Sequence, residues 1–371
     1  MQIHRVNAGE SLYSIAREYG ISPTKLKETN NLLYPDSLAP GRELLILIPT
    51  KTYTARREDT LPAIARRFAV SEAEIYKNNP SLLGTDKIYP EEILALKYPK
   101  KSHGIALLNG FVYKDFSKER LSMLMPYLSF VTVSSAVYEG GRLRSLFDNG
   151  YALKKAKESK KSVLLRVYAK NDEAYESDKF ISLVTRAATR EGFDGISIPH
   201  RESGESEAGE RFPFDLKRAL ISEGLSLQIE TDGNISEKCS EMADSLAICL
   251  DDTQGGASDL YERYAKEKNA INSFIDLSPF AYVGKRACPI DEVYSALDKI
   301  GAPLTLSDDG RIICGELRGE EVVIPSLENI KAKLDLIGEL GYLGCCIDVM
   351  RCPISHLMML SSLFHLSPDY L

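Results

Sequence analysis

Carboxylate side chains stand near the ends of several apolar runs in the second half of the chain. Glu230 closes the run LSLQIE, Asp251 follows SLAICL, and Asp348 lies in GCCIDV. Two carboxylates can act as general acid and general base if both come within hydrogen-bonding distance of one bond. Glu230 with Asp251 is such a candidate pair, and Asp348 is a third candidate. Further polar side chains at the ends of such runs are Arg166, Ser197, His200, Asp252, Asp276 and Arg351.

These side chains need a scaffold that brings the ends of many strands together. Apolar runs of β type alternate with helical stretches, at residues 105–110, 129–134, 163–168, 193–198, 225–230, 245–250, 272–277 and 344–349. Continuous hydrophobic strands separated by helices are typical of a parallel sheet that is covered on its faces. Eight of them in about 270 residues predict an α/β fold, the TIM (β/α)8 barrel, whose polar mouth is formed by the carboxyl ends of the strands. A doubly wound open sheet is the alternative.

A small insertion is expected before the last strand. The segments PLTLSDDGRIICGEL and EEVVIP are typical of an antiparallel hairpin, with DDG as its turn. The barrel with this inserted hairpin is expected to occupy residues 99–371.

The first hundred residues contain an internal repeat. GESLYSIAREYGISPTKLKETNN at 9–31 aligns with EDTLPAIARRFAVSEAEIYKNNP at 58–80, so that Asn30 matches Asn79. The apolar spacing i, i+3, i+4 and i+7 predicts a short amphipathic helix in each copy, and a second helix and a β-rich stretch follow. Each copy is therefore expected to be a small βααβ domain, at residues 1–50 and 51–98.

Composition excludes several classes of protein. Lys and Arg total 46 against 53 Asp and Glu, a net charge of -7, which argues against a nucleic-acid partner. No apolar stretch reaches the roughly 18 residues of a membrane span, and the start MQIHRVNAGE lacks the apolar core of a signal peptide. Seven cysteines without CxxC spacing favour reduced thiols, with neither a metal nor another cofactor.

The repeat resembles the LysM module, a family that binds N-acetylglucosamine-containing glycans such as peptidoglycan and chitin. The first copy carries the GESL turn, the pair Ile15-Ala16, Asn30 and Pro40-Gly41. The second copy has EDTL and Pro90-Glu91 instead, so it lacks the turn glycine and the Pro-Gly pair. We therefore expect the first copy to bind glycan more strongly.

In the LysM family the sugar lies in a shallow groove between the first strand-helix loop and the second helix-strand loop. The resemblance assigns to the first groove Gly9, Glu10, Ser11, Leu12, Asn30 and Asn31, and to the second Asp59, Thr60, Leu61, Asn78 and Asn79. Backbone amides and small polar side chains of this kind can hydrogen-bond N-acetyl and hydroxyl groups. The alternative for Asn30 and Asn79 is that they only terminate helices.

The remaining segments resemble glycoside hydrolase family 18. EGFDGISIPHR looks like the fourth strand of that family, IALLNGFVY like its first and SLAICLDD like its sixth. VVIPSLENIKAKLDLIGELGYLGCCIDV looks like its closing hairpin, helix and eighth strand. Two LysM modules joined to such a barrel are similar to the spore-cortex-lytic N-acetylglucosaminidases of endospore-forming bacteria.

The resemblance also shows which catalytic groups are missing. In family 18 the sugar's acetamido group attacks the anomeric carbon, and a Glu in the motif DGxxxDxE protonates the leaving oxygen. Asp194 and Gly195 match this motif, but the second Asp falls on Pro199 and the catalytic Glu on Arg201. An arginine, with a pKa above about 12, cannot be a general acid near neutral pH. The position of the family's floor Trp is Asp348, in a chain without any Trp.

These features predict a peptidoglycan-binding protein whose glycosidase barrel is degenerate and non-catalytic. The different-class alternative is an active peptidoglycan or chitin-type hydrolase with a relocated pair such as Glu230 and Asp251. By analogy with the family, the protein is expected to be made in the cytoplasm without a signal peptide and deposited in the spore cortex or coat. Spore-coat proteins are then the expected protein partners.

Overall fold

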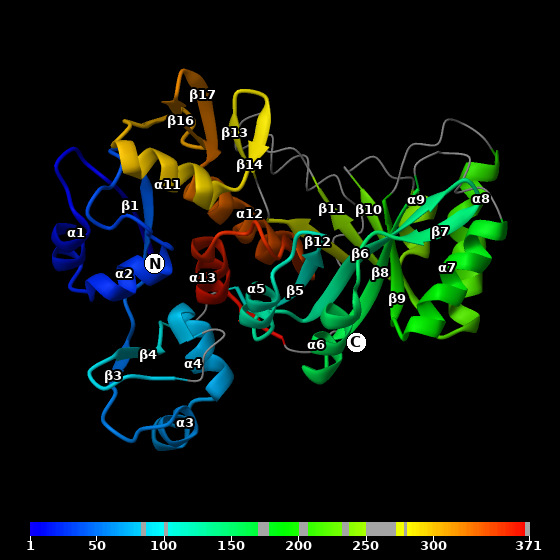
Figure 1. Cartoon of the computed structure of the whole chain (residues 1–371), viewed down its shortest axis with the longest axis horizontal. Helices are drawn as coiled ribbons and strands as arrows, with labels where there is room; N and C mark the ends of the chain where they lie inside the picture. Colours follow the sequence, from blue (N-terminus) through cyan, green and yellow to red (C-terminus); the bar gives the residue numbers. More distant parts are fainter. Residues whose placement is uncertain are drawn as a thin grey trace.

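The structure, a computed structural model, describes residues 1–82, 87–99, 103–169, 178–199, 207–231, 237–249, 272–277 and 280–367; of 207–210 and 237–239 it describes only the backbone. Two small N-terminal modules lie beside a barrel, and an inserted sheet lies near the first module (Figure 1). No helix within these ranges is long and apolar enough to cross a membrane.

Among the described residues, eight parallel strands close into the predicted barrel. Their order is β5-β6-β8-β9-β10-β11-β12-β18, and β18 pairs again with β5. The strands are β5 Ile105–Val112, β6 Phe130–Glu139, β8 Ser162–Ala169, β9 Gly195–Pro199, β10 Ser226–Thr231, β11 Ser245–Ile248, β12 Ser273–Asp276 and β18 Gly344–Asp348. Each contains residues of one predicted apolar run, so the barrel expectation is confirmed and the open sheet is excluded.

Helices cover the outside of the barrel. They are α5 Lys118–Leu124, α6 Gly150–Glu158, α7 Asp178–Glu191, α8 Glu207–Ser222, α9 Glu237–Met242, α12 Leu327–Leu340 and α13 Ile354–Leu363. Two short strands extend the sheet, β7 Arg142–Ser145 antiparallel to β6 and β19 His365–Leu366 parallel to β5. The β6–β7 hairpin was not predicted, because RLRS carries little apolar signal.

The insertion before the last strand is larger than the predicted hairpin. It is a five-stranded antiparallel sheet in the order β14-β13-β17-β16-β15, with one helix, α11 Ile290–Ile300. The strands are β13 Ala281–Val283, β14 Arg286–Cys288, β15 Thr305–Leu306, β16 Ile312–Leu317 and β17 Glu320–Pro325. The predicted DDG turn is confirmed, since it joins β15 to β16, and EEVVIP forms β17, which pairs with β16 across a second turn at Arg318 and Gly319.

Both N-terminal modules have the predicted βααβ order. The first contains β1 Gln2–Arg5, α1 Leu12–Glu18, α2 Pro23–Thr29 and β2 Glu43–Ile46. The second contains β3 Lys51–Thr54, α3 Leu61–Phe68, α4 Glu72–Asn78, a short 3-10 turn (Pro80–Leu82) and β4 Ile93–Lys97. The repeated apolar positions fill a separate core in each module, around Ile15 and Leu26 in one and Ile64 and Ile75 in the other.

Candidate functional site

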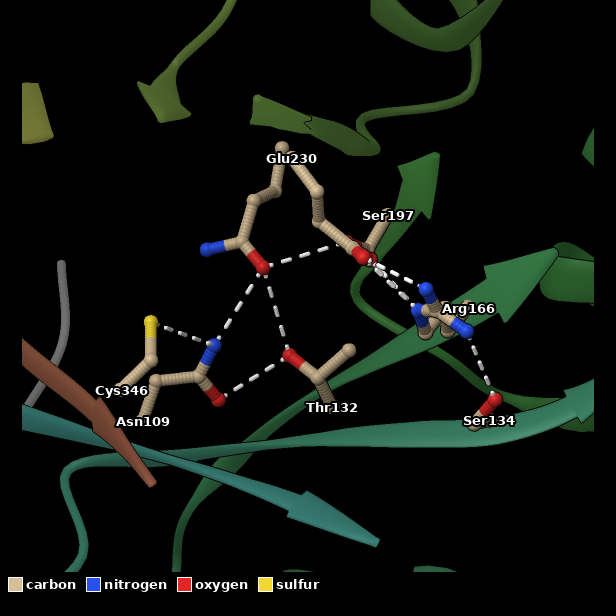
Figure 2. A network of polar contacts seen from close by, with 8 residues as sticks. Asn109, Thr132, Ser134, Arg166, Ser197, Glu230 and Cys346 are labelled. Carbon is tan, nitrogen blue, oxygen red and sulfur yellow. Dashed lines mark hydrogen bonds and ion pairs between the residues drawn. The ribbon is translucent and has the colours of Figure 1, made fainter. Parts of the chain in front are cut away.

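The mouth of the barrel holds a largely buried ion pair between Arg166 of β8 and Glu230 of β10. The guanidinium Nε lies 2.7 and 2.9 Å from the two carboxylate oxygens, and Nη2 lies 2.7 Å from Oε2 (Figure 2). Ser197 of β9 donates to Oε1 at 2.8 Å. Side chains of the two preceding strands, β8 and β9, therefore occupy both oxygens of Glu230.

A second polar layer lies below this pair, inside the barrel. The side-chain oxygen of Gln228 accepts from Asn109 at 3.3 Å and lies 3.2 Å from the Ser197 hydroxyl. Thr132 donates to the Asn109 oxygen at 3.0 Å (Figure 2). All four side chains are buried, so the hydrogen bonds offset the cost of removing these groups from water.

Burial and charge act in opposite directions on Arg166. Burial alone would lower its pKa, but the charge of Glu230 and the hydrogen bonds to it outweigh burial, and the pKa of Arg166 is raised. The guanidinium carbon also lies 5.8 Å from the centre of the Tyr113 ring. Burial raises the pKa of Tyr113, so its phenol stays neutral. The arginine is thus a permanent cation at the mouth.

A cavity of about 300 Å³ opens above the ion pair. Its walls are Phe111, Tyr113, Glu230, Cys249, Asp276, Phe280, Cys346, Asp348 and Arg351. The structure thus brings two of the predicted candidate acids, Glu230 and Asp348, to one cavity, together with Asp276. Asp251, the predicted partner of Glu230, lies outside the described residues, as do His200 and Asp252.

Both carboxylate oxygens of Asp348, like those of Glu230, accept hydrogen bonds. One of its oxygens accepts the backbone N–H of Met350 at 2.8 Å and of Arg351 at 3.1 Å. The other accepts the Arg351 guanidinium at 2.5 Å, and Arg351 also reaches Asp115 at 2.6 Å. The carboxylates of Glu230 and Asp348 would each have to break an ion pair with an arginine before acting on a substrate bond.

The fourth-strand motif does not bring a carboxylate to the mouth among the described residues. Asp194 precedes β9, at the opposite end of the barrel, where its oxygens bind Lys157 at 2.7 Å and the backbone N–H of Val163 at 2.7 Å. Pro199 ends β9, opposite Glu230 in the strand register. Arg201 lies outside the described residues. Asp194 is therefore a strand-start carboxylate.

In the LysM modules, Asn30 and Asn79 differ from the expectation that their side chains line a groove. Asn30 donates to the carbonyls of Leu26 and Leu45 and accepts the backbone N–H of Leu45. Asn79 makes the same three bonds with Ile75 and Ala95, and both side chains are buried. An asparagine amide can replace a backbone partner in this way. These two residues join a helix end to a strand, which is close to the alternative stated for them above.

The other predicted groove residues form turns and caps. Glu10 accepts from the Asn7 backbone at 2.6 Å, and Ser11 caps α1. Asp59 accepts from Tyr53 and from the Arg56 backbone, and Thr60 caps α3. Leu12 and Leu61 are buried, as is Asn78, which donates to the Leu96 carbonyl. Any sugar contact made by these residues must therefore rest mainly on backbone groups, such as those around the open Gly9.

The helix-strand loop of the first module docks on the insertion. Arg42 forms a buried ion pair with Asp298 of α11, and its guanidinium carbon lies 4.5 Å from the centre of the Tyr294 ring. Burial raises the pKa of Asp298 and the charge of Arg42 opposes this. The Ala39 backbone donates to Asp298 at 2.9 Å, and the Asn31 amide donates to Asp291 at 2.9 Å. The predicted groove residue Asn31 is thus a contact with the insertion.

Gly41 shows why the two copies differ in the Pro-Gly pair. Its φ is 87°, and a Cβ there would lie 2.0 Å from the Leu304 carbonyl oxygen of the insertion. In the second copy Glu91 has a φ of 70°. Gly41 was one reason to expect that the first copy binds glycan more strongly. Its close approach to the insertion explains why a glycine stands there. The ranking of the two copies as glycan binders stays a prediction.

Sequence reasoning missed the exposed apolar side chains beside the first module's loops. Tyr13 is 62% exposed, Leu33 63% and Tyr34 40%. They follow Leu12 and Asn31, the ends of the two predicted groove loops. Exposed large apolar side chains can mark a binding surface, and a Tyr next to a predicted groove loop was the signal to look for.

Comparison with known proteins identifies the two N-terminal modules. The LysM domain model matches residues 4–47 and 53–97, so the chain carries two LysM domains. A Bacillus subtilis (strain 168) protein named "Putative sporulation-specific glycosylase YdhD" is 33% identical over 139 residues, 36% of this chain and 31% of that protein. The N-acetylmuramoyl-L-alanine amidase sle1 of Staphylococcus saprophyticus is 32% identical over 102 residues, 24% of this chain and 30% of the amidase. The chain thus spans about a third of the length of these relatives.

Solved structures show the fold of the whole chain. The spore cortex-lytic enzyme SleL of Bacillus megaterium QM B1551 matches all of this chain and 99% of its own, with a TM-score of 0.73 and 18% identity. A chitinase from Chromobacterium violaceum ATCC 12472 matches 69% of this chain and 98% of its own, with a TM-score of 0.60 and 14% identity. The barrel therefore shares its fold with SleL and with chitinases, one of them named as a GH18 chitinase, from Cycas revoluta.

Proposed function

We propose that this chain binds a glycan containing N-acetylglucosamine, peptidoglycan foremost, and that its family 18-like barrel does not hydrolyse it. The two LysM domains support the binding. The exposed Tyr13, Leu33 and Tyr34 beside the first module's loops offer apolar faces on which a sugar ring can pack.

The observation that carries the second half of the proposal is the Arg166–Glu230 ion pair. A general acid must reach the glycosidic oxygen within about 3 Å. Both oxygens of Glu230 already accept hydrogen bonds from Arg166, and one also accepts from Ser197. Pro199 has no side-chain hydrogen-bonding group that could orient an acetamido nitrogen. Arg166, Ser197 and Glu230 are therefore bonded to one another at the mouth, and each oxygen of Glu230 already accepts a hydrogen bond.

The names of the relatives support a role in the spore envelope. YdhD is named for sporulation, and SleL is named as a spore cortex-lytic enzyme. We therefore propose that the chain is made in the cytoplasm of a sporulating cell and deposited in the cortex or coat, where coat proteins are its protein partners. Immunogold labelling of sporulating cells tests this, and label confined to the cytoplasm would contradict it.

Co-sedimentation of the intact chain with insoluble peptidoglycan and with chitin tests the binding. The wild type should appear in both pellets, because both polymers carry N-acetylglucosamine. The double substitution Tyr13→Ala/Tyr34→Ala should weaken binding by roughly tenfold, since each ring packed on a sugar contributes about 0.7 kcal/mol. Ile300→Ala, at a site 60% exposed on α11, is the matched control and should bind as wild type. A folded wild-type chain that stays in the supernatant would overturn the proposal.

A second candidate function is glycan hydrolysis by a relocated site. It is favoured by one observation, that Glu230, Asp276 and Asp348 line the same cavity. Under this candidate, Glu230→Gln would abolish turnover. Under the binding proposal there is no turnover to abolish.

A further inference from the structure

A second cavity lies on the outside of the barrel, between the β6–β7 hairpin and helix α7. It holds about 620 Å³, twice the volume of the cavity at the mouth. A smaller groove of about 440 Å³ continues from it towards α8 and shares Arg186 and Arg190 with it. Together they form an extended depression distinct from the barrel mouth and from the LysM modules.

The charge of this cavity is opposite to that of the chain. Five cations line it, Arg142, Arg144, Lys179, Arg186 and Arg190, against one carboxylate, Glu191, in a chain with a net charge of -7. Arg144 pairs with Glu139 at 3.2 Å and Arg190 with Glu191 at 2.9 Å. Within the described parts of the chain, Arg142, Lys179 and Arg186 form no ion pair.

The fold gathers these cations from two walls. Lys179, Arg186 and Arg190 recur along α7 at spacings of seven and four, so they share one face of that helix. Arg142 comes from β7, and the ammonium of Lys179 lies close to Gly141 of the hairpin turn, 2.9 Å from the position a Cβ would take there. Like charges four residues apart destabilise a helix. A counter-charge from outside would relieve this repulsion.

The uncharged residues that line the cavity indicate which class of ligand it could bind. Ala136, Leu143, Leu165, Leu183 and Ala187 form apolar walls between the cations. The hydroxyl of Thr185, in the adjoining groove, is buried and has no hydrogen-bond partner among the described residues. A bare phosphate chain would gain nothing from the leucine and alanine walls. A short peptide with several carboxylates and small aliphatic side chains fits both features.

We propose that this cavity binds a short anionic peptide through Arg142, Lys179 and Arg186. If the proposed function is correct, the peptide branches of peptidoglycan, which carry free carboxylates, are such a ligand. The LysM modules would then hold the glycan strand while this cavity holds its peptide. The identification of the ligand, though not the charge of the cavity, rests on the proposed function.

The test measures binding of the intact chain by titration calorimetry to three soluble probes. These are a disaccharide-tetrapeptide released from peptidoglycan by muramidase, the free tetrapeptide, and the disaccharide without peptide. The wild type should bind the free tetrapeptide, and binding should weaken as salt rises. Lys179→Glu/Arg186→Glu should lower this affinity by about 100-fold, roughly tenfold for each charge-assisted hydrogen bond that the substitutions remove.

Matched controls separate the cavity from general charge effects and from unfolding. Lys154→Glu/Arg218→Glu makes the same change of charge at two exposed sites outside the cavity and should bind the tetrapeptide as wild type. Arg142→Glu, on the opposite wall, should lower the affinity about tenfold by itself and serves if the α7 variant fails to fold.

The outcomes distinguish this inference from the proposed function. Tetrapeptide binding without binding to peptide-free chitin would support the cavity and contradict the glycan proposal. Chitin binding with no affinity for the tetrapeptide would overturn the cavity and leave the glycan proposal standing. Tetrapeptide binding that survives in both cavity variants, or preferential binding of polyphosphate over the peptide, would also overturn the inference.

Discussion

Substitution of Arg166 should show how much the ion pair at the barrel mouth contributes to the free energy of unfolding. The side chains of Arg166 and Glu230 are only 17% and 10% exposed. Arg166→Met keeps a chain of similar length but leaves the Glu230 carboxylate buried without its cation. Breaking a buried pair in this way costs about 3–5 kcal/mol. For a domain of this size that corresponds to a fall in Tm of roughly 6–20 °C.

Three further measurements make this prediction specific. Arg166→Met/Glu230→Gln should recover most of the missing stability, because the second change removes the uncompensated charge. Arg190→Met removes a cation that is 72% exposed, and it should change stability by less than about 1 kcal/mol. Urea unfolding of the four proteins at pH 7.5 gives all the values needed.

Two results would refute this argument. One is a loss of less than about 1 kcal/mol in Arg166→Met, the size expected for an exposed ion pair. The other is a double variant, Arg166→Met/Glu230→Gln, that is no more stable than Arg166→Met, because the uncompensated carboxylate would then not be the cause of the loss.

Four other predictions concern separate parts of the chain. Asp298→Asn leaves Arg42 buried without a counter-charge, so limited proteolysis should release the first module faster than in wild type, and equal rates would contradict the docking. Burial lowers the pKa of His356 to about 3, so the neutral imidazole contributes its full stability above about pH 6.5, and this contribution is lost as pH falls. In urea unfolding, the wild type should lose about 3 kcal/mol of stability between pH 7.5 and 4.5 from this residue. His356→Gln should not show this loss. Asn30→Ala leaves the backbone N–H and carbonyl of Leu45 without their partner and should destabilise the first module by about 2–4 kcal/mol in thermal melts, whereas weaker glycan affinity at unchanged stability would restore the groove role. Arg201→Glu should yield no hydrolysis in a reducing-sugar assay, because Pro199 still leaves an acetamido group unoriented; turnover by this variant would show that only the acid was missing.

The barrel could be predicted because most residues of its strands are apolar and the strands alternate with helical segments. Each run, such as 163–168 or 225–230, stands out against the charged helical segments around it. The insertion was underestimated because Ala281–Val283 and Arg286–Cys288 are three-residue strands with little apolar periodicity. Short strands of this kind acquire their structure from the sheet that they join.

The candidate site was only partly predictable for a similar reason. Alternation along each strand indicates that Glu230 faces the barrel interior. Its partner depends on the relative register of β8, β9 and β10, which aligns Arg166 with Ser197 and Pro199 with Glu230. Register arises from tertiary packing and is absent from local sequence. The sequence left two roles open for Asn30 and Asn79, because an amide that replaces a backbone partner has the same sequence signature as one that binds a ligand.

One measurement tests the central claim most directly, that the chain binds glycan and leaves it intact. The purified protein is incubated with muramidase-trimmed cortex fragments and with chitooligosaccharides, and bound glycan and new reducing ends are quantified in the same samples. The account predicts saturable binding with no new reducing ends above a protein-free control. New reducing ends that disappear with Glu230→Gln or Asp251→Asn would contradict it and establish a relocated hydrolase site.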